Sequence, residues 1–142
     1  MVEAAIFLPV FVFIVLGMLE LAVLVLRYNW VSEASRQGAR MAVVRGALAP
    51  GTTGTPVMNS WGPSTYEEPA TDAGEIAKSL EPYTTLLEPS RTTIRVEWPD
   101  GDLEVGSRVR FKVTTSHEAF ISSLFGGRTW TVSGTSTMVI AH

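Results

Sequence analysis

The feature that most restricts how this chain can fold is an apolar run near its start. Between Ala4 and Leu26, the only positions that are not hydrophobic are Pro9, Gly17 and Glu20. As an α-helix these 23 residues would be about 34 Å long, which matches a hydrocarbon core of about 30 Å. A secretory signal fits poorly, because its apolar run is only about 7–15 residues long and follows basic residues. The run therefore predicts a membrane span or the core helix of an assembly.

The helical pattern continues beyond the apolar run, so residues 1–46 are predicted to form one long helix. Pro9 lacks a backbone N–H and crowds the preceding turn, which predicts a kink near that position. Small residues recur at intervals of four at Ala34, Gly38 and Ala42. Such a stripe of small side chains allows a neighbouring backbone or sheet to approach the helix closely.

Aromatic and basic residues mark the end of the apolar run. Arg27, Tyr28 and Trp30 are of the types that anchor a helix at a membrane interface. The positive-inside rule creates a conflict, because arginines that follow the run would place the C-terminal part in the cytoplasm. A basic leader that once preceded Met1 and has been removed would resolve this conflict. Such a leader is a hypothesis, which N-terminal sequencing of the native protein would test.

Glu20 is the one charged residue inside the apolar run. A carboxylate at the centre of a bilayer costs about 2.5–3.5 kcal/mol on the insertion scale, so its presence needs a reason. Two interpretations are open. The side chain extends to the nearby interface, or it makes a polar contact with the helix of a neighbouring subunit.

Residues 47–142 are predicted to form a small globular head. Its first part, residues 47–71, is rich in Gly, Pro, Ser and Thr and is predicted to be a loop. Trp61 and Tyr66 within it are expected to pack the loop onto the head, and the alternative is that they form a binding surface.

A short helix is predicted over residues 72–81. The pair Thr71-Asp72 is suited to cap its start, and Pro82 is expected to end it. This helix is the only one predicted for the head apart from a short helical or irregular stretch, HEAFISSLFGG, before the last strand.

An antiparallel sheet is predicted over residues 92–141, with one face on the helix and the other in water. Polar and apolar residues alternate in three segments, which is typical of half-buried strands. The segments are residues 92–98, 103–115 and one that follows Gly127. The residues expected on the inner face are Ile94, Val96, Trp98, Val109, Phe111, Val113, Trp130, Val132, Met138 and Ile140.

Little in the sequence indicates catalysis. The chain has two histidines, His117 and His142, and no cysteine. It lacks a G-x-S-x-G motif, a phosphate-binding glycine loop and an H-E-x-x-H motif. Residues 1–46 carry a net charge of +1 (three acids, four arginines) and the rest −4 (eleven acids, seven bases), which excludes a basic nucleic-acid footprint. We expect no enzyme activity, no cofactor and no nucleic-acid partner.

Two charged clusters in the head have alternative interpretations. Asp100, Asp102 and Glu104 alternate as calcium ligands might, but the rest of the EF-hand pattern is missing, so a solvated hairpin turn is favoured. A basic row could meet an acidic partner subunit, but a solvated sheet face that discourages edge aggregation is favoured. The basic row consists of Arg95, Arg108, Arg110 and Lys112.

The N-terminal stretch resembles the TadE-like family of pilins and pseudopilins from tight-adherence pilus systems. The matching features are the Val2-Glu3-x-Ala opening, Leu8-Pro9, Gly17-x-x-Glu20, and Ala34 with Gly38-Ala39-Arg40. The resemblance is strong over residues 1–46. It is looser over the C-terminal strands, which end in GTSTMVIA.

This resemblance implies a short basic leader removed by a prepilin peptidase, with the helix in the inner membrane and the head exported. It also implies assembly by an ATPase-driven machine into or beneath a filament on the bacterial surface, with other copies or other pilins as partners. Glu3 would match the acid that pairs with a neighbour's N-terminal amine in type IV-like pilins and so helps to set register. In those pilins the acid is the fifth residue of the mature chain, whereas here it is the third.

These features together favour a pilin-like α+β fold and a structural pilin subunit of a Tad filament. The expected assembly residues are Glu3, Pro9, Gly17, Glu20, Ala34, Gly38 and Ala42, and the speculative head contacts are Trp61, Tyr66, Arg108, Arg110 and Lys112. The alternatives are a minor or priming pseudopilin and a solitary membrane-anchored extracytoplasmic binding module. A solitary anchor would have no use for Pro9, Glu20 or the small-residue stripe.

Overall fold

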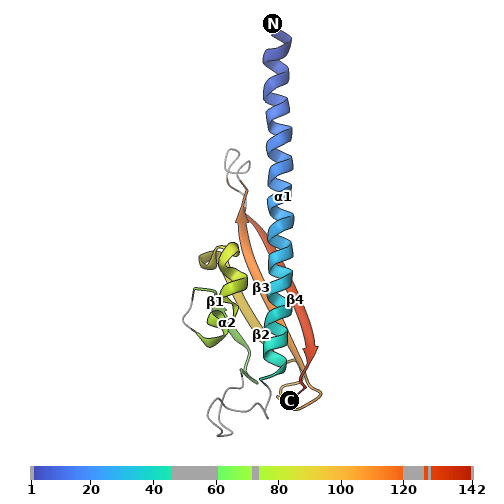
Figure 1. Cartoon of the computed structure of the whole chain (residues 1–142), viewed down its shortest axis with the longest axis vertical. Helices are drawn as coiled ribbons and strands as arrows, with labels where there is room; N and C mark the ends of the chain where they lie inside the picture. Colours follow the sequence, from blue (N-terminus) through green and yellow to red (C-terminus); the bar gives the residue numbers. More distant parts are fainter. Residues whose placement is uncertain (1, 46–60, 72–73, 120–126, 128, 142) are drawn as a thin grey trace.

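The computed structural model describes residues 2–45, 61–71, 74–119, 127 and 129–141. It confirms the predicted α+β class, because one long helix precedes an antiparallel sheet (Figure 1). Among these residues the α-helices are α1 (Val2–Val43) and α2 (Glu75–Thr84), and the 3-10 helices are η1 (Thr85–Leu87) and η2 (Pro89–Arg91). The strands are β1 (Tyr66–Pro69), β2 (Thr92–Glu97), β3 (Arg108–Glu118) and β4 (Thr129–Val139).

Helix α1 has 42 residues and is about 63 Å long at roughly 1.5 Å per residue. Its N-terminal part extends away from the rest of the molecule, whereas its C-terminal part lies along the sheet (Figure 1). The helix is unbroken through Pro9, so the proline does not end it, and the kink near Pro9 stays a prediction. A proline removes a single backbone hydrogen bond, and the adjoining turns of a long helix are sufficient to keep it continuous.

The sheet is an antiparallel meander with the strand order β1-β2-β3-β4. The register places Val96 of β2 opposite Tyr66 of β1 and Phe111 of β3. The predicted inner face of residues 92–98 and of β3 is confirmed, because its residues are at most 6% exposed. They are Ile94, Val96, Trp98, Val109, Phe111 and Val113. Strand β1 lies inside the segment that was predicted to be a loop; its sequence YEEP shows no apolar alternation, so only the pairing with β2 reveals it.

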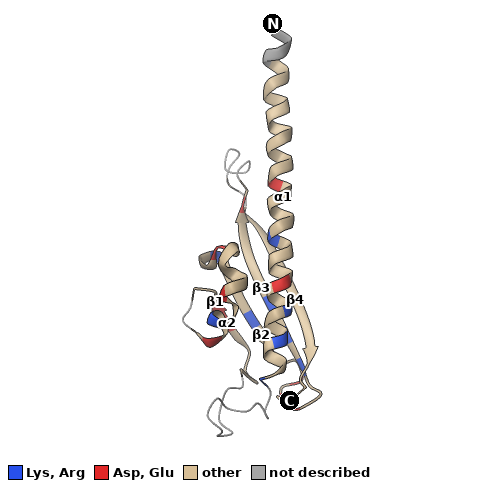
Figure 2. Cartoon of the chain, viewed as in Figure 1, with Lys and Arg blue, Asp and Glu red and all other residues tan. Residues whose placement is uncertain are grey.

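The C-terminal half of α1 and the shorter α2 cover one face of the sheet and form the core with it. The α1 residues that reach this core are Val31, Ala34, Ala39 and Ala42, which are 0–3% exposed. The basic residues of β2 and β3, which Figure 2 marks in blue on these strands, alternate with the buried positions and so lie on the opposite face of the sheet. The head is therefore two layers thick. The C-terminal half of α1 belongs to its core, whereas the N-terminal part of the same helix extends beyond the head.

Helix and sheet approach each other closely at two glycines. A Cβ atom added to Gly38 would lie 2.3 Å from Cε1 of Phe111, and one added to Gly134 would lie 2.8 Å from the carbonyl oxygen of Val31. Both distances are shorter than van der Waals contact, so only glycine fits at these positions without a shift of its neighbour. The small residues of α1 thus allow the chain's own sheet to pack against the helix.

Helix α2 starts and ends differently from the prediction. It begins at Glu75 after Gly74, with no side-chain cap from Gly74, and it continues through Pro82 to Thr84. The buried Glu68 of β1 accepts a hydrogen bond from the N–H of Ala77 at 3.1 Å, so a carboxylate from the sheet stabilises the first turn. Asp72 lies outside the described residues. Pro82 does not end the helix, because Leu80 and Thr84 on either side are held in the core.

Strand β3 extends further toward the exposed N-terminal part of α1 than the sequence indicated. Strand β3 starts at Arg108 rather than near Leu103, and it runs to Glu118, into the stretch expected to be helical or irregular. Trp130, expected in the core, is 53% exposed at the start of β4. It shares the helix-facing side with Val132, but the core does not extend to its end of the sheet.

Candidate functional site

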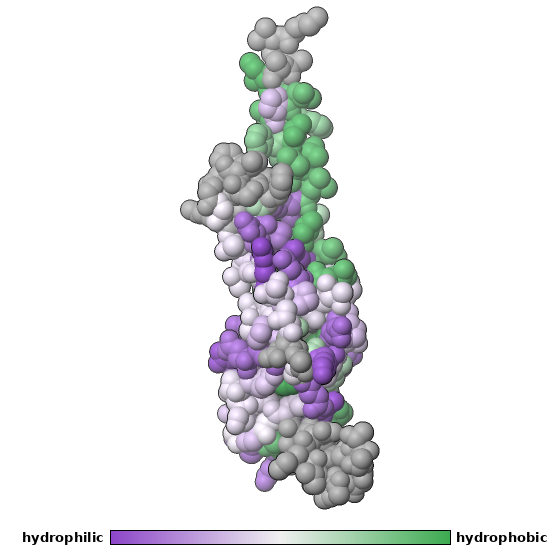
Figure 3. Space-filling model, turned by 90° about the vertical axis from the view of Figure 1, so that its left-hand side faces the viewer, coloured by the Kyte–Doolittle hydropathy of each residue, from purple (hydrophilic) through white to green (hydrophobic). Residues whose placement is uncertain are grey.

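Helix α1 exposes a long apolar surface outside the head. From Ile6 to Val15 every side chain is exposed, and the large hydrophobic ones are 37–76% accessible. The helix contains a stretch with a mean hydropathy of 2.7, none of which is buried, so it is long and apolar enough to cross a membrane. On the face shown in Figure 3, hydrophobic side chains cover most of this part and continue beside the upper end of the head.

Some of these exposed side chains form a stripe with alternating spacings of four and three residues. The stripe, called the apolar stripe below, consists of Phe7, Phe11, Ile14, Met18, Leu21, Val25 and Tyr28, and its members are 52–76% exposed. Such spacing averages 3.5 residues and keeps side chains on one side of a helix, as in the seam between two packed helices. The stripe is therefore suited to contact a second helix along its length.

The head begins to cover α1 near Glu20. A shallow pocket at this point is lined by Leu16, Leu19, Glu20 and Val23 of α1 and by His117 and Glu118 of β3. The residues expected to anchor the helix at a membrane interface lie below this level. Trp30 packs against the core, and the Nη1 atom of Arg27 is buried. Of the three expected anchors, only Tyr28 is largely exposed, at 55%.

Glu20 lies next to a histidine of the same chain. Its Oε1 atom is 3.9 Å from Nε2 of His117, and both side chains are largely covered, at 17% and 8% exposure. Neither ring nitrogen of His117 has a hydrogen-bond partner among the described residues. Burial lowers the pKa of His117 below its usual value, the positive charges of Arg27 and Arg91 lower it further, and Glu20 opposes them. Glu20 thus has an intramolecular neighbour that neither sequence interpretation included.

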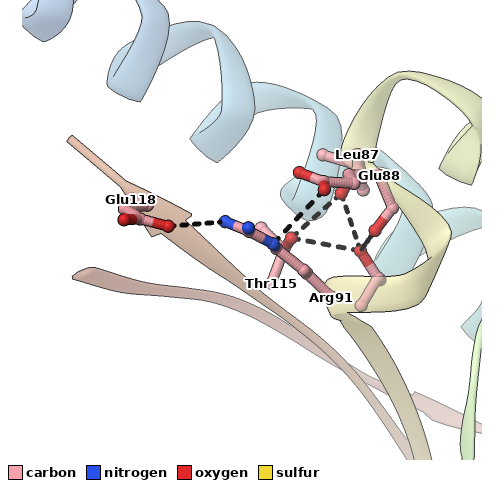
Figure 4. Close-up of polar contacts among 6 residues, drawn as sticks. Leu87, Glu88, Arg91, Thr115 and Glu118 are labelled. Carbon is pink, nitrogen blue, oxygen red and sulfur yellow. Dashed lines mark hydrogen bonds and ion pairs between the residues drawn. The ribbon is translucent and has the colours of Figure 1, made fainter. Parts of the chain in front are cut away.

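A hydrogen-bonded network fixes the end of β3 that carries His117 (Figure 4). The hydroxyl of Thr115 donates to the carbonyl oxygen of Leu87 at 3.1 Å, which ties β3 to η1. Arg91 of η2 bridges Glu88 at 3.2 Å and Glu118 at 3.4 Å. These side chains are 41–45% exposed, so the ion pairs orient groups more than they stabilise the fold.

The stability of the head should depend on the protonation of His117. Its folded-state pKa is lowered, so the unfolded chain binds a proton at a higher pH than the folded chain does. The part of the free energy of unfolding that depends on neutral His117 is fully present above the usual histidine pKa of about 6.5. It is lost as the pH falls from there through the lowered pKa of the folded state. Thermal unfolding between pH 7 and 5 should show this loss. In His117→Gln the dependence should be flatter, whereas His142→Gln, which changes the other histidine, should behave as the wild type.

The small-residue stripe expected to serve assembly is buried beneath the chain's own sheet. Ala34 and Ala42 are 0% and 3% exposed, and Gly38 faces the ring of Phe111. Pro9 is exposed and Gly17 is half-covered. The side chain of Glu3 lies outside the described residues. Its pairing with a neighbour's amine therefore stays a prediction.

The aromatic residues of the predicted loop pack onto the head. The guanidinium of Arg45 lies 4.5 Å from the ring centre of Trp61, and Arg45 also pairs with Glu75 of α2. Trp61 and Tyr66 are both half-buried against the core. This arrangement supports the packing interpretation of Trp61 and Tyr66.

The basic row on the outer face of the sheet is largely neutralised by acids of β1, β2 and the turn before β3. Arg95 pairs with Glu97 at 2.6 Å and with Glu67 at 3.3 Å, and Arg110 lies 3.5 Å from Glu97. Among the described residues, Lys112 has no acid within ion-pair distance. This face therefore has the character of a solvated, charge-balanced sheet surface.

Asp100 in the turn before β3 binds an arginine. Its carboxylate accepts hydrogen bonds from the backbone N–H of Arg108 at 2.8 Å and from the guanidinium at 2.6 Å. The side-chain bond from Arg108 is the main reason why the pKa of Asp100 is lowered to about 2. Asp102 accepts a hydrogen bond from the N–H of Glu104 at 3.2 Å. The contacts are those of a hairpin turn, and Arg108 at the start of β3 binds that turn rather than contributing to an open basic patch.

Comparison with known proteins adds one match. The family model described as "TadE-like protein" matches residues 1–40, which cover most of α1. The predicted resemblance is thereby confirmed for this segment, in which the hydrophobic helix is similar to the TadE-like family. Searches among curated proteins and among solved structures found no match.

Proposed function

We propose that this TadE-like chain is a structural pilin subunit of a Tad-type filament and that copies associate through the apolar stripe of α1. One observation carries the proposal: the stripe continues past the level where the head begins. Leu21, Val25 and Tyr28 stay 55–63% exposed beside the head. A helix that only anchors a head in lipid has no need of a large apolar surface next to polar residues, whereas a second helix would bury it.

The energy available from such a contact is substantial. Full burial of an exposed leucine or valine side chain contributes about 1.5–3 kcal/mol. Leu21 and Val25 are 63% and 57% exposed, so covering what remains of both would stabilise each contact by about 2–4 kcal/mol. Every copy carries the same stripe over its bare part, with Phe7, Phe11 and Ile14 as complementary apolar partners. The same surface can therefore serve repeatedly in a helical assembly.

The proposal includes a place in the cell. The helix would reside in the inner membrane after removal of a leader by a prepilin peptidase. An ATPase-driven assembly machine would then move the subunit into an extracellular filament on the bacterial surface. The exposed apolar helix supports membrane residence before assembly.

Two other functions make different predictions for the stripe. A minor or priming pseudopilin would use the stripe against a different pilin, at low copy number. A solitary extracytoplasmic binding module would leave the stripe in contact with lipid only. The continuation of the stripe to Tyr28 favours the two pilin functions over the solitary module.

Disulfide cross-linking in cells tests the proposal cleanly, because the chain has no cysteine of its own. The double variant Ile14→Cys/Val25→Cys places one thiol on the bare part of the stripe and one beside the head. Oxidation should give a ladder of multimers in both the membrane and the sheared surface fractions. The matched control Ile14→Cys/Ser35→Cys replaces Val25 by a core position that is 1% exposed, and it should give no ladder.

The other outcomes identify the alternatives. Monomers alone, with the protein present in the membrane, would mean a solitary anchor. A single cross-linked product that contains a second kind of pilin would mean a minor or priming subunit.

A further inference from the structure

We propose that a second copy of the chain packs the exposed N-terminal part of its α1 into the groove between α1 and β4, displaced along the helix axis by two repeats of the apolar stripe. Phe11 of the second copy then lies on Val25, and its Ile14 lies on Tyr28. The inference rests on the proposed function and deepens it, because it adds β4 to the contact between copies and gives that contact a register.

The groove lies where α1 crosses the last strand of the sheet. Its walls are residues of α1 (Leu24, Val25 and Tyr28) and of β4 (Thr131, Val132 and Ser133). The groove has a volume of about 410 Å³. An apolar cavity of about 150 Å³ is enough to hold a benzene ring, so this groove has room for a phenylalanine or an isoleucine side chain.

The head's own elements cover only one flank of α1. On the side of β1 and β2 the helix α2 packs against α1, and α2 is held there by the hydrogen bond from Ala77 to Glu68 (Figure 1). Strand β4 is at the edge of the sheet, and among the described elements only α1 and β3 pack extensively against it. The β4 side of α1 therefore offers a second helix a place that corresponds to the place of α2 on the other side.

The exposed part of α1 has the chemistry that this groove requires. Phe7, Phe11 and Ile14 are 52–76% exposed, and every copy carries both these side chains and the groove. Lipid fits the groove less well, because a hydrocarbon core of about 30 Å that starts at Ala4 ends roughly at Val23. Copies in one membrane point in the same direction, so a contact between helix and groove can repeat from copy to copy.

The position of the head restricts the displacement between copies. The head begins to cover α1 near Glu20, so only earlier residues are free to enter the groove of another copy. The apolar stripe repeats every seven residues. After a displacement of one repeat, Leu21 of the second copy would face Tyr28, and its head would compete for the space beside β4. Two repeats, about 21 Å, is the smallest displacement that brings a residue of the exposed part, Ile14, to Tyr28.

Thiol cross-linking in cell membranes with a short bismaleimide tests the groove. The variant Ile14→Cys/Ser133→Cys should give a ladder of multimers, because Ser133 is exposed and lines the groove. The matched control Ile14→Cys/Thr137→Cys moves the second thiol four residues along the same face of β4, to an exposed position outside the groove. This control should give no ladder.

The displacement is tested by oxidation of two further variants. Phe11→Cys/Val25→Cys places its thiols opposite each other after two repeats, whereas the thiols of Met18→Cys/Val25→Cys meet after one repeat. The first variant should form the longer ladder. A longer ladder from the second variant would overturn the displacement.

The ladder of Ile14→Cys/Val25→Cys separates this inference from the proposed function. If that ladder forms and Ile14→Cys/Ser133→Cys gives no more product than its Thr137 control, the groove is left to lipid or solvent. The inference would then be overturned while the proposed function stands. If the ladder of Ile14→Cys/Val25→Cys itself is absent, the association of copies through the stripe is overturned.

Discussion

Replacing Phe111 with alanine will destabilise the head by about 3–5 kcal/mol, a large part of the total stability of a small domain. The ring is fully buried at the centre of the inner face of β3, and it lies directly against α1 at Gly38. Its removal leaves a cavity between the two layers that the rigid helix cannot collapse to fill. Thermal unfolding in detergent should show a fall in Tm of more than about 10 °C.

The same contact can be examined from the helix side. Gly38→Ala should destabilise by about 1–3 kcal/mol through crowding of the ring, although alanine favours the helix by about 1 kcal/mol. A smaller partner should relieve the crowding, so Gly38→Ala/Phe111→Leu should cost less than the sum of the two single changes. Arg40→Ala, at an exposed position of the same helix, is the control and should have little effect. Strict additivity of the two changes would mean that ring and helix do not meet at Gly38.

A lysine in place of Phe11 will disable membrane insertion without unfolding the head. Phe11 is 57% exposed and lies far from the core, near the middle of Ala4–Leu19, the segment without charged residues between Glu3 and Glu20. A lysine at the centre of a bilayer costs about 2.5–3.5 kcal/mol, which corresponds to a loss of roughly 100-fold in the insertion equilibrium. Carbonate extraction of cell membranes should find much less of the variant in the membrane than of the wild type.

Two controls make this result specific. Phe11→Leu keeps the apolar character and should insert normally. The Tm of the detergent-solubilised Phe11→Lys variant should equal that of the wild type, because the head does not contact position 11. A variant that extracts like the wild type would mean that the bare part of α1 is covered by protein rather than by lipid.

The elements with a strong local pattern could be predicted from the sequence. The length and character of α1 follow from its apolar run, and the inner faces of β2 and β3 follow from strict alternation around Val96 and Phe111. Strand β1 has no such pattern, and the start of α2 depends on Glu68, which comes from another element. Propensity rules see only neighbours in the sequence, so a cap supplied across space is invisible to them.

The sequence predicted which residues contribute to the candidate site, but not how these residues are arranged in space. The apolar run supplied all of the stripe except Tyr28, yet nearly every position in that run is apolar, so only the fold reveals which side stays exposed beside the head. The small residues around Gly38 were expected to face a neighbour backbone or a sheet, and the chain's own sheet took that place. The proximity of Glu20 to His117 needed the tertiary structure, since the two residues lie on elements that are distant in the sequence.

The continuity of α1 has a mechanical consequence. The single helix α1 forms both the exposed N-terminal extension and one layer of the head's core, with no glycine-rich linker or hinge between the two parts. Any tilt or rotation of the exposed part of α1 therefore moves the head with it, because the helix is continuous and behaves as one rigid body. A pull along the helix reaches the sheet through the packing around Phe111, where it acts as shear between two layers rather than as the peeling of one strand.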